Sequence, residues 1–372
     1  FRRILAWADD FTAGRVLFTL GGGYSFSAAP RVWAILYLVI HGLDVTRDLP
    51  ETWRSKWSRS SKDELPHALH DPNPSHADIP NRYEIAHRNR QVAERERVPY
   101  VASSSLDQRL TQRGNLYFFR ISRLEPFVDA TTAVPLELLP AKDVAILFSA
   151  TPGATQLARL QRERLEAHGV RVSAFESFQT GTPDFIPLLA RVKASGSRLL
   201  LMDGFFADNL VLLRQLSGQM GPGFAVVGAF GMEFPALVEQ LGPLAEGAIG
   251  AIVWEPGMSL PGDLEGSRAY ETGFTWEFKH PPAPLSMYGY TAARAVLAAL
   301  EKASNTSFPP ERDAVRDALR GTDLLLPLER LQFDEHGDPR HYEVGIFQIQ
   351  NGRHVLLYPR EKAAGKMITP KS

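Results

Sequence analysis

The sequence has no cysteine among its 372 residues. This absence excludes disulfide bonds, thiolate nucleophiles and metal sites with cysteine ligands. An excess of charge is also missing, because 41 lysine and arginine residues balance 42 aspartate and glutamate residues. Proteins that bind nucleic acid or anionic membrane surfaces normally carry a basic excess, so we expect neither kind of partner.

Long hydrophobic runs are absent as well. The longest run, VWAILYLVI at Val32–Ile40, is about half as long as a membrane-spanning helix. We expect a buried helix or strand there. The chain starts at Phe1 without the basic segment, apolar core and cleavage site of a secretory signal. The sequence therefore predicts a soluble protein whose start is processed or truncated.

Familiar catalytic and nucleotide-binding motifs do not occur. There is no G-x-S-x-G elbow and no H-E-x-x-H motif. Residues 149–156, SATPGATQ, lack the lysine and the spacing of a P-loop, and Phe26 replaces the third glycine that a dinucleotide site needs. Asp334, His336 and Asp338 resemble a metal site, but a turn rich in Asp and Gly explains them more simply. We expect no enzyme activity, no metal and no cofactor.

The first quarter of the chain differs from the rest. Residues 51–98 are rich in charged side chains and contain HDPNPSHADIP, which is composed of turn-forming residues. No strand pattern is present, so we predict a surface loop or a partly disordered segment.

From Val98 onward, short apolar runs alternate with helical patterns. Strands are predicted at 98–105, 115–122, 143–149, 170–178, 197–205, 224–230 and 247–254. Helices are predicted at 154–165, 180–195, 207–219, 233–242, 289–303 and 310–321. Continuous apolar strands separated by helices predict an α/β fold with a parallel sheet covered on both faces.

Single residues mark several boundaries in this part of the chain. Gly169 has the place of a left-handed helix cap, and Asp184 that of an N-cap with Pro187 in the first turn. A loop is expected after Trp254, before the helix at 289–303. Asn351-Gly352 predicts a two-residue hairpin between two strands.

Small hydroxyl and aromatic residues follow the predicted strands. The carboxyl ends of strands line the ligand crevice of a doubly wound sheet, where helix N-termini hold anionic groups and aromatic rings enclose the remainder. The alternative, that these aromatic residues only fill the edge of the core, stays open. The residues concerned are Ser103, Ser104, Ser105, Ser149–Gly153, Phe205, Phe206, Phe230–Phe234 and Trp254.

The order of these segments resembles the type I periplasmic solute-binding proteins of branched-chain amino acid ABC transporters. The resemblance runs from Val98 to Pro359 and includes VPYVASSSLDQRLTQRGNLYFFRIS, the 142–206 segment, GYTAARAVLAALEKA and the closing F-D-x-x-G-D run. It implies two α/β lobes joined by a three-stranded hinge. Lobe 1 is expected at 98–122 and 257–330, lobe 2 at 123–256 and 331–360, and a tail at 361–372.

The resemblance also implies a ligand site. Ser103, Ser104 and Ser105 would hold a ligand carboxylate, Pro152 and Gly153 correspond to the contact turn of the second lobe, and Phe205 with Phe206 matches an aromatic wall. Trp254 is a further candidate at a strand end.

Two departures from the family pattern affect the expected ligand and lobe. The acidic residue that many members use for an ammonium group would fall near Phe230, while Glu233 lies three residues away. An amino acid and an aromatic or aliphatic carboxylate therefore both stay open as ligands. Residues 1–97 lack the start of the family pattern, so this part of lobe 1 is expected to be atypical, truncated or disordered.

We predict an extracytoplasmic, periplasmic solute-binding component of an ABC importer. Its partners would be a small amino acid or carboxylate and a membrane permease, and we expect a monomer without a cofactor. Hinge closure on the ligand would be the mechanism. A ligand sensor on the same fold is the main alternative, and an enzyme on this scaffold is a weaker one.

Overall fold

The computed structural model describes residues 82–112, 114–216, 218–220, 223–306 and 308–368. The chain divides into two units, residues 1–85 and 86–372. The predictions for Phe26, Val32–Ile40 and residues 51–81 lie outside the described residues. The predicted lobe boundaries stay a prediction.

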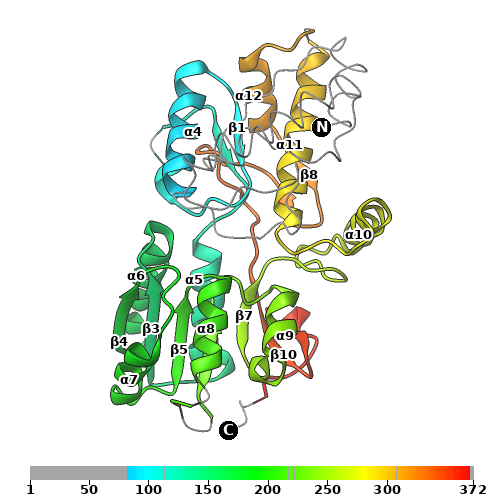
Figure 1. The fold of residues 1–372 in the computed structure, drawn as a ribbon. Helices are drawn as coiled ribbons and strands as arrows, with labels where there is room; N and C mark the ends of the chain where they lie inside the picture. Colours follow the sequence, from blue (N-terminus) through cyan, green and yellow to red (C-terminus); the bar gives the residue numbers. More distant parts are fainter. Residues whose placement is uncertain (1–81, 113, 217, 221–222, 307, 369–372) are drawn as a thin grey trace, which may run out of the picture. The chain divides into compact units, whose positions relative to one another are not determined.

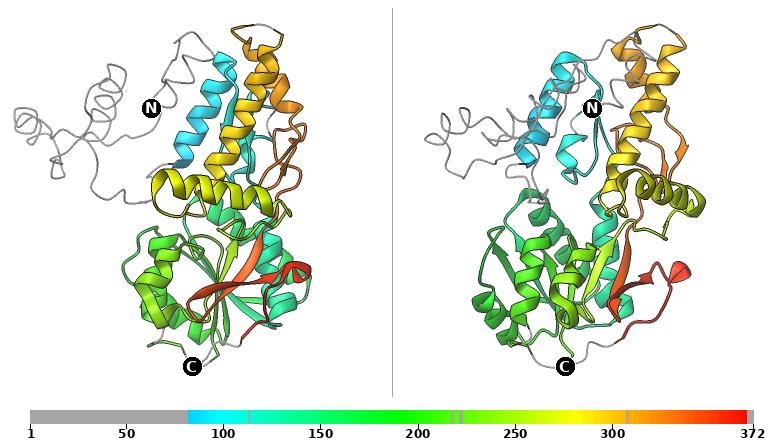
Figure 2. Two further views of the ribbon diagram at one scale, coloured as in Figure 1. Left: turned by 90° about the vertical axis from the view of Figure 1, so that its right-hand side faces the viewer. Right: turned by 45° about the vertical axis from the view of Figure 1, so that its right-hand side comes forward.

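A seven-stranded sheet with the order β11-β10-β7-β6-β5-β3-β4 is the centre of the described fold (Figure 1). β4, β3, β5, β6 and β7 are parallel, and β10 and β11 are antiparallel at one edge, as Figure 2 shows from two further sides. The strands are β3 (Asp143–Ser149), β4 (Arg171–Phe178), β5 (Leu199–Asp203), β6 (Ala225–Gly228), β7 (Ile249–Ile252), β10 (Gly345–Gln350) and β11 (Arg353–Tyr358). The predicted α/β class with a mostly parallel sheet is confirmed.

Helices cover both faces of this sheet because successive strand residues point to opposite sides. In β3, Ile146 packs in one buried cluster with residues of α5 and α6, while Leu147 packs in a second cluster with residues of α7, α8 and α9. The helices are α5 (Glu125–Ala133), α6 (Pro152–Ala167), α7 (Ile186–Ala194), α8 (Phe206–Leu216) and α9 (Pro235–Leu241). Side chains on both faces of the sheet are therefore buried under helices, as the apolar strands predicted.

A second group of elements surrounds a parallel pair of short strands. The group comprises α4 (Arg82–Glu96), β1 (Tyr100–Ala102), β2 (Phe118–Arg120), α11 (Ser286–Ser304), α12 (Arg312–Arg320), β8 (Leu324–Leu325) and β9 (Arg330–Leu331). The Tyr117 hydroxyl accepts hydrogen bonds of 2.8 Å from Arg97 and of 2.8 Å from Arg316, and it donates to Asp313. This one phenol thus joins the end of α4 to β2 and α12.

Two segments predicted as loops are helical instead. Residues 82–96 form α4, and residues 264–278 form α10 (Leu264–Phe278). α10 begins where the Asp263 side chain accepts from the Gly266 N–H at 3.1 Å, and among its residues only Ser267 is buried. The sequence of α4 is mostly polar and shows no helical apolar pattern. In α10 the signal was present but missed, because Tyr270, Phe274 and Phe278 recur every four residues and their rings are in contact.

Turn residues explain most element boundaries. Gly169 has φ 76°, and Asn351 and Gly352 have φ 52° and 70°, so the predicted helix cap and hairpin turn are both confirmed. The helix predicted at 180–195 starts later, at Ile186. The Asp184 side chain accepts from the Ile186 N–H at 2.9 Å, but Phe185 takes the N-cap position.

A buried ion pair anchors the F-D-x-x-G-D turn to β2. The Arg120 side chain is 0% exposed and donates to both carboxylate oxygens of Asp338, at 2.5 and 2.8 Å. Gly337 has φ 89°, and a Cβ there would lie 2.5 Å from the Phe118 carbonyl oxygen, so only glycine fits. Asp334 accepts from the backbone N–H groups of His336 and Asp338, which supports the turn interpretation of this motif.

Substitution of one partner of this pair tests its role. Asp338→Asn leaves the Arg120 charge buried without a counter-ion, so we expect a loss of about 3–5 kcal/mol in the free energy of unfolding. Urea denaturation followed by circular dichroism measures the loss. The matched control is Asp323→Asn, which breaks the exposed pair of Asp323 with Arg330 and should change the midpoint little. Equal midpoints for the two variants would show that the buried pair does not anchor the turn.

Candidate functional site

The sheet order places three predicted site loops beside one another. β3 has β4 on one side and β5 on the other, although β4 precedes β5 in the chain, so the direction of winding changes at β3. Ligands of open α/β sheets bind outside the carboxyl ends of the strands at such a switch point. The loops after β3, β5 and β6 carry Pro152 with Gly153, Phe205 with Phe206, and Phe230 with Glu233.

The loop after β3 leads directly into α6. Thr151 takes the N-cap position with ψ 150°, and Pro152 is the first helical residue, where its missing N–H costs no hydrogen bond. Pro152 is exposed and Gly153 is buried. The first turn of a helix leaves N–H groups without partners inside the helix and carries partial positive charge, so this end of α6 suits an anionic group.

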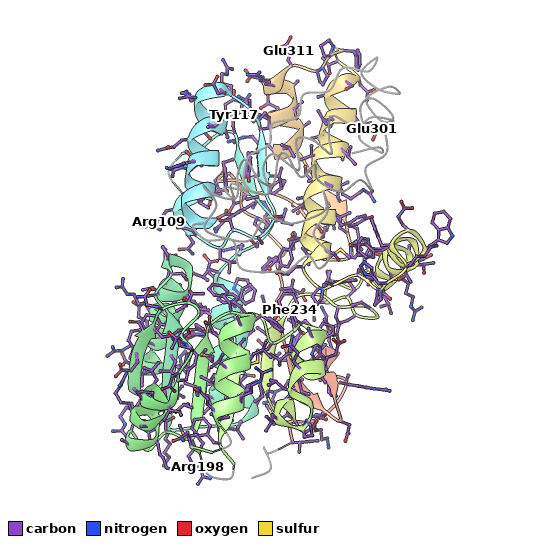
Figure 3. All side chains as sticks on the ribbon, in the orientation of Figure 1. Arg109, Tyr117, Arg198, Phe234, Glu301 and Glu311 are labelled. Carbon is purple, nitrogen blue, oxygen red and sulfur yellow. The ribbon has the colours of Figure 1, made fainter. Side chains whose placement is uncertain are left out.

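The aromatic residues of the next two loops contact one another. The rings of Phe205 and Phe230 stack with centroids 6.0 Å apart and planes inclined by 18°, and Phe230 lies 5.2 Å from Phe127 of α5. Phe206 meets Phe234 edge to face at 5.5 Å. Figure 3 labels Phe234 at the end of the sheet where α8 and α9 begin.

Backbone contacts fix the position of Phe230. Asn209 of α8 donates to the Phe230 carbonyl oxygen at 2.7 Å. Gly231 follows with φ 80°, and a Cβ there would lie 2.4 Å from the backbone nitrogen of Phe206. Asp208 accepts from the Phe205 N–H at 3.0 Å. The loops after β5 and β6 are thus held together by contacts that leave no room for a side chain at position 231.

Glu233 lies in the same loop with an unusual carboxyl group. The side chain keeps partial exposure, but its Oε2 atom is shielded from solvent and has no hydrogen-bond partner among the described residues. Burial raises the pKa of Glu233 to about 7, and backbone hydrogen bonds at Glu233 and Gly231 oppose the rise. At neutral pH this carboxyl therefore exists in both protonation states, and one of its oxygens is shielded from solvent without a hydrogen-bond partner among the described residues.

The serines predicted to hold a carboxylate follow β1. Ser104 is exposed, Ser103 and Ser105 are half-buried, and the Ser105 carbonyl oxygen accepts from the Ser122 hydroxyl at 3.0 Å. Three residues further on, the Gln108 side chain accepts a 2.8 Å hydrogen bond from Gln156 of α6. This amide pair connects the segment after the serines to the helix that starts at Pro152.

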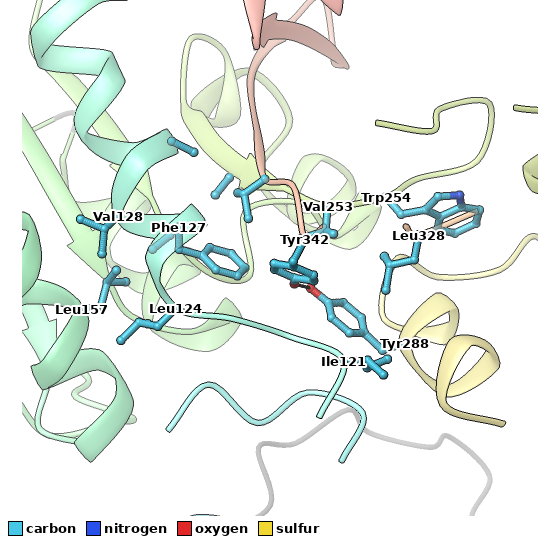
Figure 4. Packing of buried hydrophobic residues seen from close by; sticks show 14 of the residues in the cluster. Ile121, Leu124, Phe127, Val128, Leu157, Val253, Trp254, Tyr288, Leu328 and Tyr342 are labelled. Carbon is cyan, nitrogen blue, oxygen red and sulfur yellow. Dashed lines mark hydrogen bonds between the residues drawn. The ribbon is translucent and has the colours of Figure 1, made fainter. Parts of the chain in front are cut away.

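Trp254 belongs to the core and not to the group of strand-end loops. Its side chain is 1% exposed, its indole N–H donates to the Ser267 hydroxyl at 2.9 Å, and its ring meets Tyr270 edge to face at 5.6 Å. Figure 4 shows Trp254 near Leu328 in this cluster. Its role as a ligand residue stays a prediction.

Sequence reasoning missed a polar cluster that includes three residues. Tyr288 of α11 and Tyr342, which precedes β10, share a 2.6 Å hydrogen bond between their hydroxyls (Figure 4). Glu329 is fully buried, neither of its carboxylate oxygens has a hydrogen-bond partner among the described residues, and burial raises its pKa to about 8. Burial raises the pKa values of the two tyrosines, and the charges of Glu233 and Glu329 add to this rise. No sequence motif indicates such a cluster, because its members are far apart in the sequence.

Metal sites and membrane-spanning helices are further features to consider in the described part of the chain. No group of three or more His, Asp or Glu side chains among these residues is arranged as a metal site. No helix in the same part is long and apolar enough to cross a membrane.

Comparisons with known proteins were made for the whole chain. Residues 80–353 match the model of a family described as periplasmic binding protein. The leucine-, isoleucine-, valine-, threonine- and alanine-binding protein of Pseudomonas aeruginosa is 24% identical over 261 residues, which are 69% of this chain and 66% of that protein. The chain thus spans about two thirds of the length of that curated relative.

Solved structures show the same architecture. A leucine-binding protein from Thermotoga maritima superposes with a TM-score of 0.63 at 20% identity, over 73% of this chain and 75% of that chain. A solute-binding protein of an ABC transporter from Rhodopseudomonas palustris, solved with 3,4-dihydroxybenzoic acid, gives a TM-score of 0.62 at 18% identity, over 77% of each chain. The predicted two-lobed α/β fold is thereby confirmed.

Gly231 offers a test of how the aromatic loops are held. Gly231→Ala places a methyl group against the Phe206 backbone and strains a left-handed φ, so we expect a loss of about 1–3 kcal/mol in the free energy of unfolding. Thermal unfolding measures the effect. The control is Gly196→Ala, which imposes a similar φ of 80° but has nothing within 4 Å of the added Cβ. If both variants lose the same amount, the close contact with Phe206 contributes nothing.

Proposed function

Because this chain belongs to the periplasmic binding protein family, we propose that it is the extracytoplasmic solute-binding component of an ABC importer. It captures an amino acid or a related small carboxylate and presents it to a membrane permease. The observation that carries this proposal is the convergence of the loops after β3, β5 and β6 at the switch point of the sheet. Relatives are named as binding proteins and not as sensors or enzymes, which favours capture over signalling or turnover.

The ligand carboxylate has two complementary groups of contacts in this proposal. Ser103, Ser104 and Ser105 offer hydroxyl and backbone N–H donors, and the α6 start at Pro152 and Gly153 offers the positive end of a helix. The Gln108–Gln156 hydrogen bond supports this pairing, since it connects the two segments. Contacts of one ligand with both segments stabilise the conformation in which they are close, so binding shifts the population toward it.

Glu233 receives the ammonium group when the ligand is an amino acid. Its Oε2 has no hydrogen-bond partner among the described residues, so an ammonium group that reaches this shielded atom breaks no existing hydrogen bond. An adjacent cation also stabilises the ionised carboxylate. The name of the Pseudomonas relative supports an amino acid. The acid bound to the Rhodopseudomonas protein keeps a carboxylate without an ammonium group as the competitor.

Ligand capture is tested by calorimetric titration of the full chain with L-leucine, L-alanine and hydrocinnamate, together with thermal unfolding. A ligand at 100 times its Kd adds about 2.7 kcal/mol to the free energy of unfolding, so at least one probe should raise the Tm clearly. Recovery of the unchanged ligand by mass spectrometry separates capture from turnover. A cooperatively unfolding chain that binds none of a wider panel of amino acids and organic acids would contradict the proposal.

The pH dependence of amino-acid binding tests the role of Glu233. An ammonium ligand requires the ionised carboxylate, and with a pKa of about 7 Glu233 is largely protonated at pH 6. We therefore expect the Kd of an amino acid to rise about tenfold from pH 8 to pH 6, because binding must first release a proton.

Glu233→Gln should weaken amino-acid binding at pH 8 and remove this pH dependence. The matched control is Glu239→Gln, which changes an exposed residue of α9 and should leave the dependence intact. The same pH profile in both variants would exclude Glu233 as the ammonium contact.

A further inference from the structure

Four aromatic side chains from separate segments form a continuous group, which we call the aromatic wall. Its members are Phe127 of α5, Phe205 after β5, Phe230 after β6, and Tyr342 before β10. Phe230 is 5.2 Å from Phe127 and 6.0 Å from Phe205, and Phe127 is 6.3 Å from Tyr342. Figure 4 shows the Phe127 ring turned toward Tyr342.

Phe230 is the member of the wall that retains access to solvent. Phe127, Phe205 and Tyr342 are buried, with 5%, 7% and 6% of their surface exposed, whereas Phe230 is only partly buried. Single exposed aromatic residues are common. Phe230 differs because it follows β6, the strand next to β5, and its ring contacts the buried rings of Phe205 and Phe127.

Contacts within the protein fix the position of the wall. The Asn209 side chain holds the Phe230 carbonyl oxygen, and the approach of Gly231 to Phe206 sets the path of the loop. A surface held in this way loses little conformational entropy when a ligand packs on it. Aromatic pairs in offset-stacked or edge-to-face geometry also gain attraction beyond the area that they bury.

We propose that the solute carries an aromatic ring, which packs on Phe230 within the aromatic wall. The inference rests on the proposed capture of a carboxylate-bearing solute and specifies its side group. It does not depend on an ammonium group, which concerns Glu233. An aromatic probe should bind about three- to tenfold more tightly than an aliphatic probe with the same polar groups, the range that a ring–ring contact supplies.

The experiment uses two matched pairs of probes in calorimetric titrations of the full chain. L-Phenylalanine and L-leucine carry an ammonium group, and hydrocinnamate and isocaproate are the same two acids without it. We expect the aromatic probe to bind more tightly than the aliphatic probe in at least one of the pairs that bind. In no pair should the aliphatic probe bind more tightly. Equal or tighter binding of the aliphatic member in every pair that binds would overturn the inference and leave solute capture intact.

The variant Phe230→Leu keeps an apolar side chain of similar reach but removes the ring. It should reduce the aromatic preference to near unity while the aliphatic probes keep their affinity within about twofold. The matched control is Phe278→Leu in α10, where the side chain is 53% exposed, and it should retain the wild-type preference. A preference that survives in Phe230→Leu overturns the role of the wall. Failure of all four probes to bind the wild-type chain overturns the inference together with solute capture.

Discussion

A parallel sheet constrains this molecule more than any single contact does. Each of the strands β3 to β6 must be followed by a crossover that returns to the other end of the sheet before the next parallel strand begins. The loops that leave the carboxyl ends of the parallel strands therefore all lie at the same end of the sheet. The turn before α6, the phenylalanines after β5 and the Phe230–Glu233 loop are brought together by this rule. Their side chains then need only local contacts to be placed.

The strand-end region contains both closely packed backbone segments and buried carboxyl groups whose ionisation is unfavourable. Gly231 allows two backbones to meet, and Asn209 and Asp208 hold the loop ends. Asp203 at the end of β5 is fully buried, accepts from Gln161 at 3.1 Å, and has its pKa raised to about 8 by burial. A carboxyl group whose pKa is raised on folding stabilises the fold below its unfolded pKa, and this stabilisation is lost as the pH rises through the folded value. The strand-end region therefore contains polar groups that burial holds partly or largely in the neutral form.

The fold could be predicted from the sequence because the information is local. Continuous apolar runs predicted β3, β5, β6 and β7, and Gly169 and Asn351-Gly352 marked turns by their conformational freedom. Three helices, α4, α5 and α10, were not predicted from the sequence.

The site was predictable only in part. Residues that follow strands, such as Phe205 and Phe230, could be found because the carboxyl ends of parallel strands lie together at one end of the sheet. Sequence reasoning could not find Phe127, Tyr288, Tyr342 and Glu329. These residues come from segments that are far apart in the chain, and only the folded structure brings the segments together. Neither their neighbours in the sequence nor their spacing distinguishes them from ordinary core residues.

The arrangement of β7 and β10 has a consequence for how the chain acquires its structure. Residues 253–344 separate β7 from its partner β10 in the sequence, yet the two strands pair directly in the sheet. During synthesis from the N-terminus, β7 has an unpaired edge until the β10–β11 hairpin is available. Exposed strand edges invite pairing with other chains. The β10–β11 hairpin thus covers the free edge of β7, and until the hairpin is made that edge stays open to pairing with other chains.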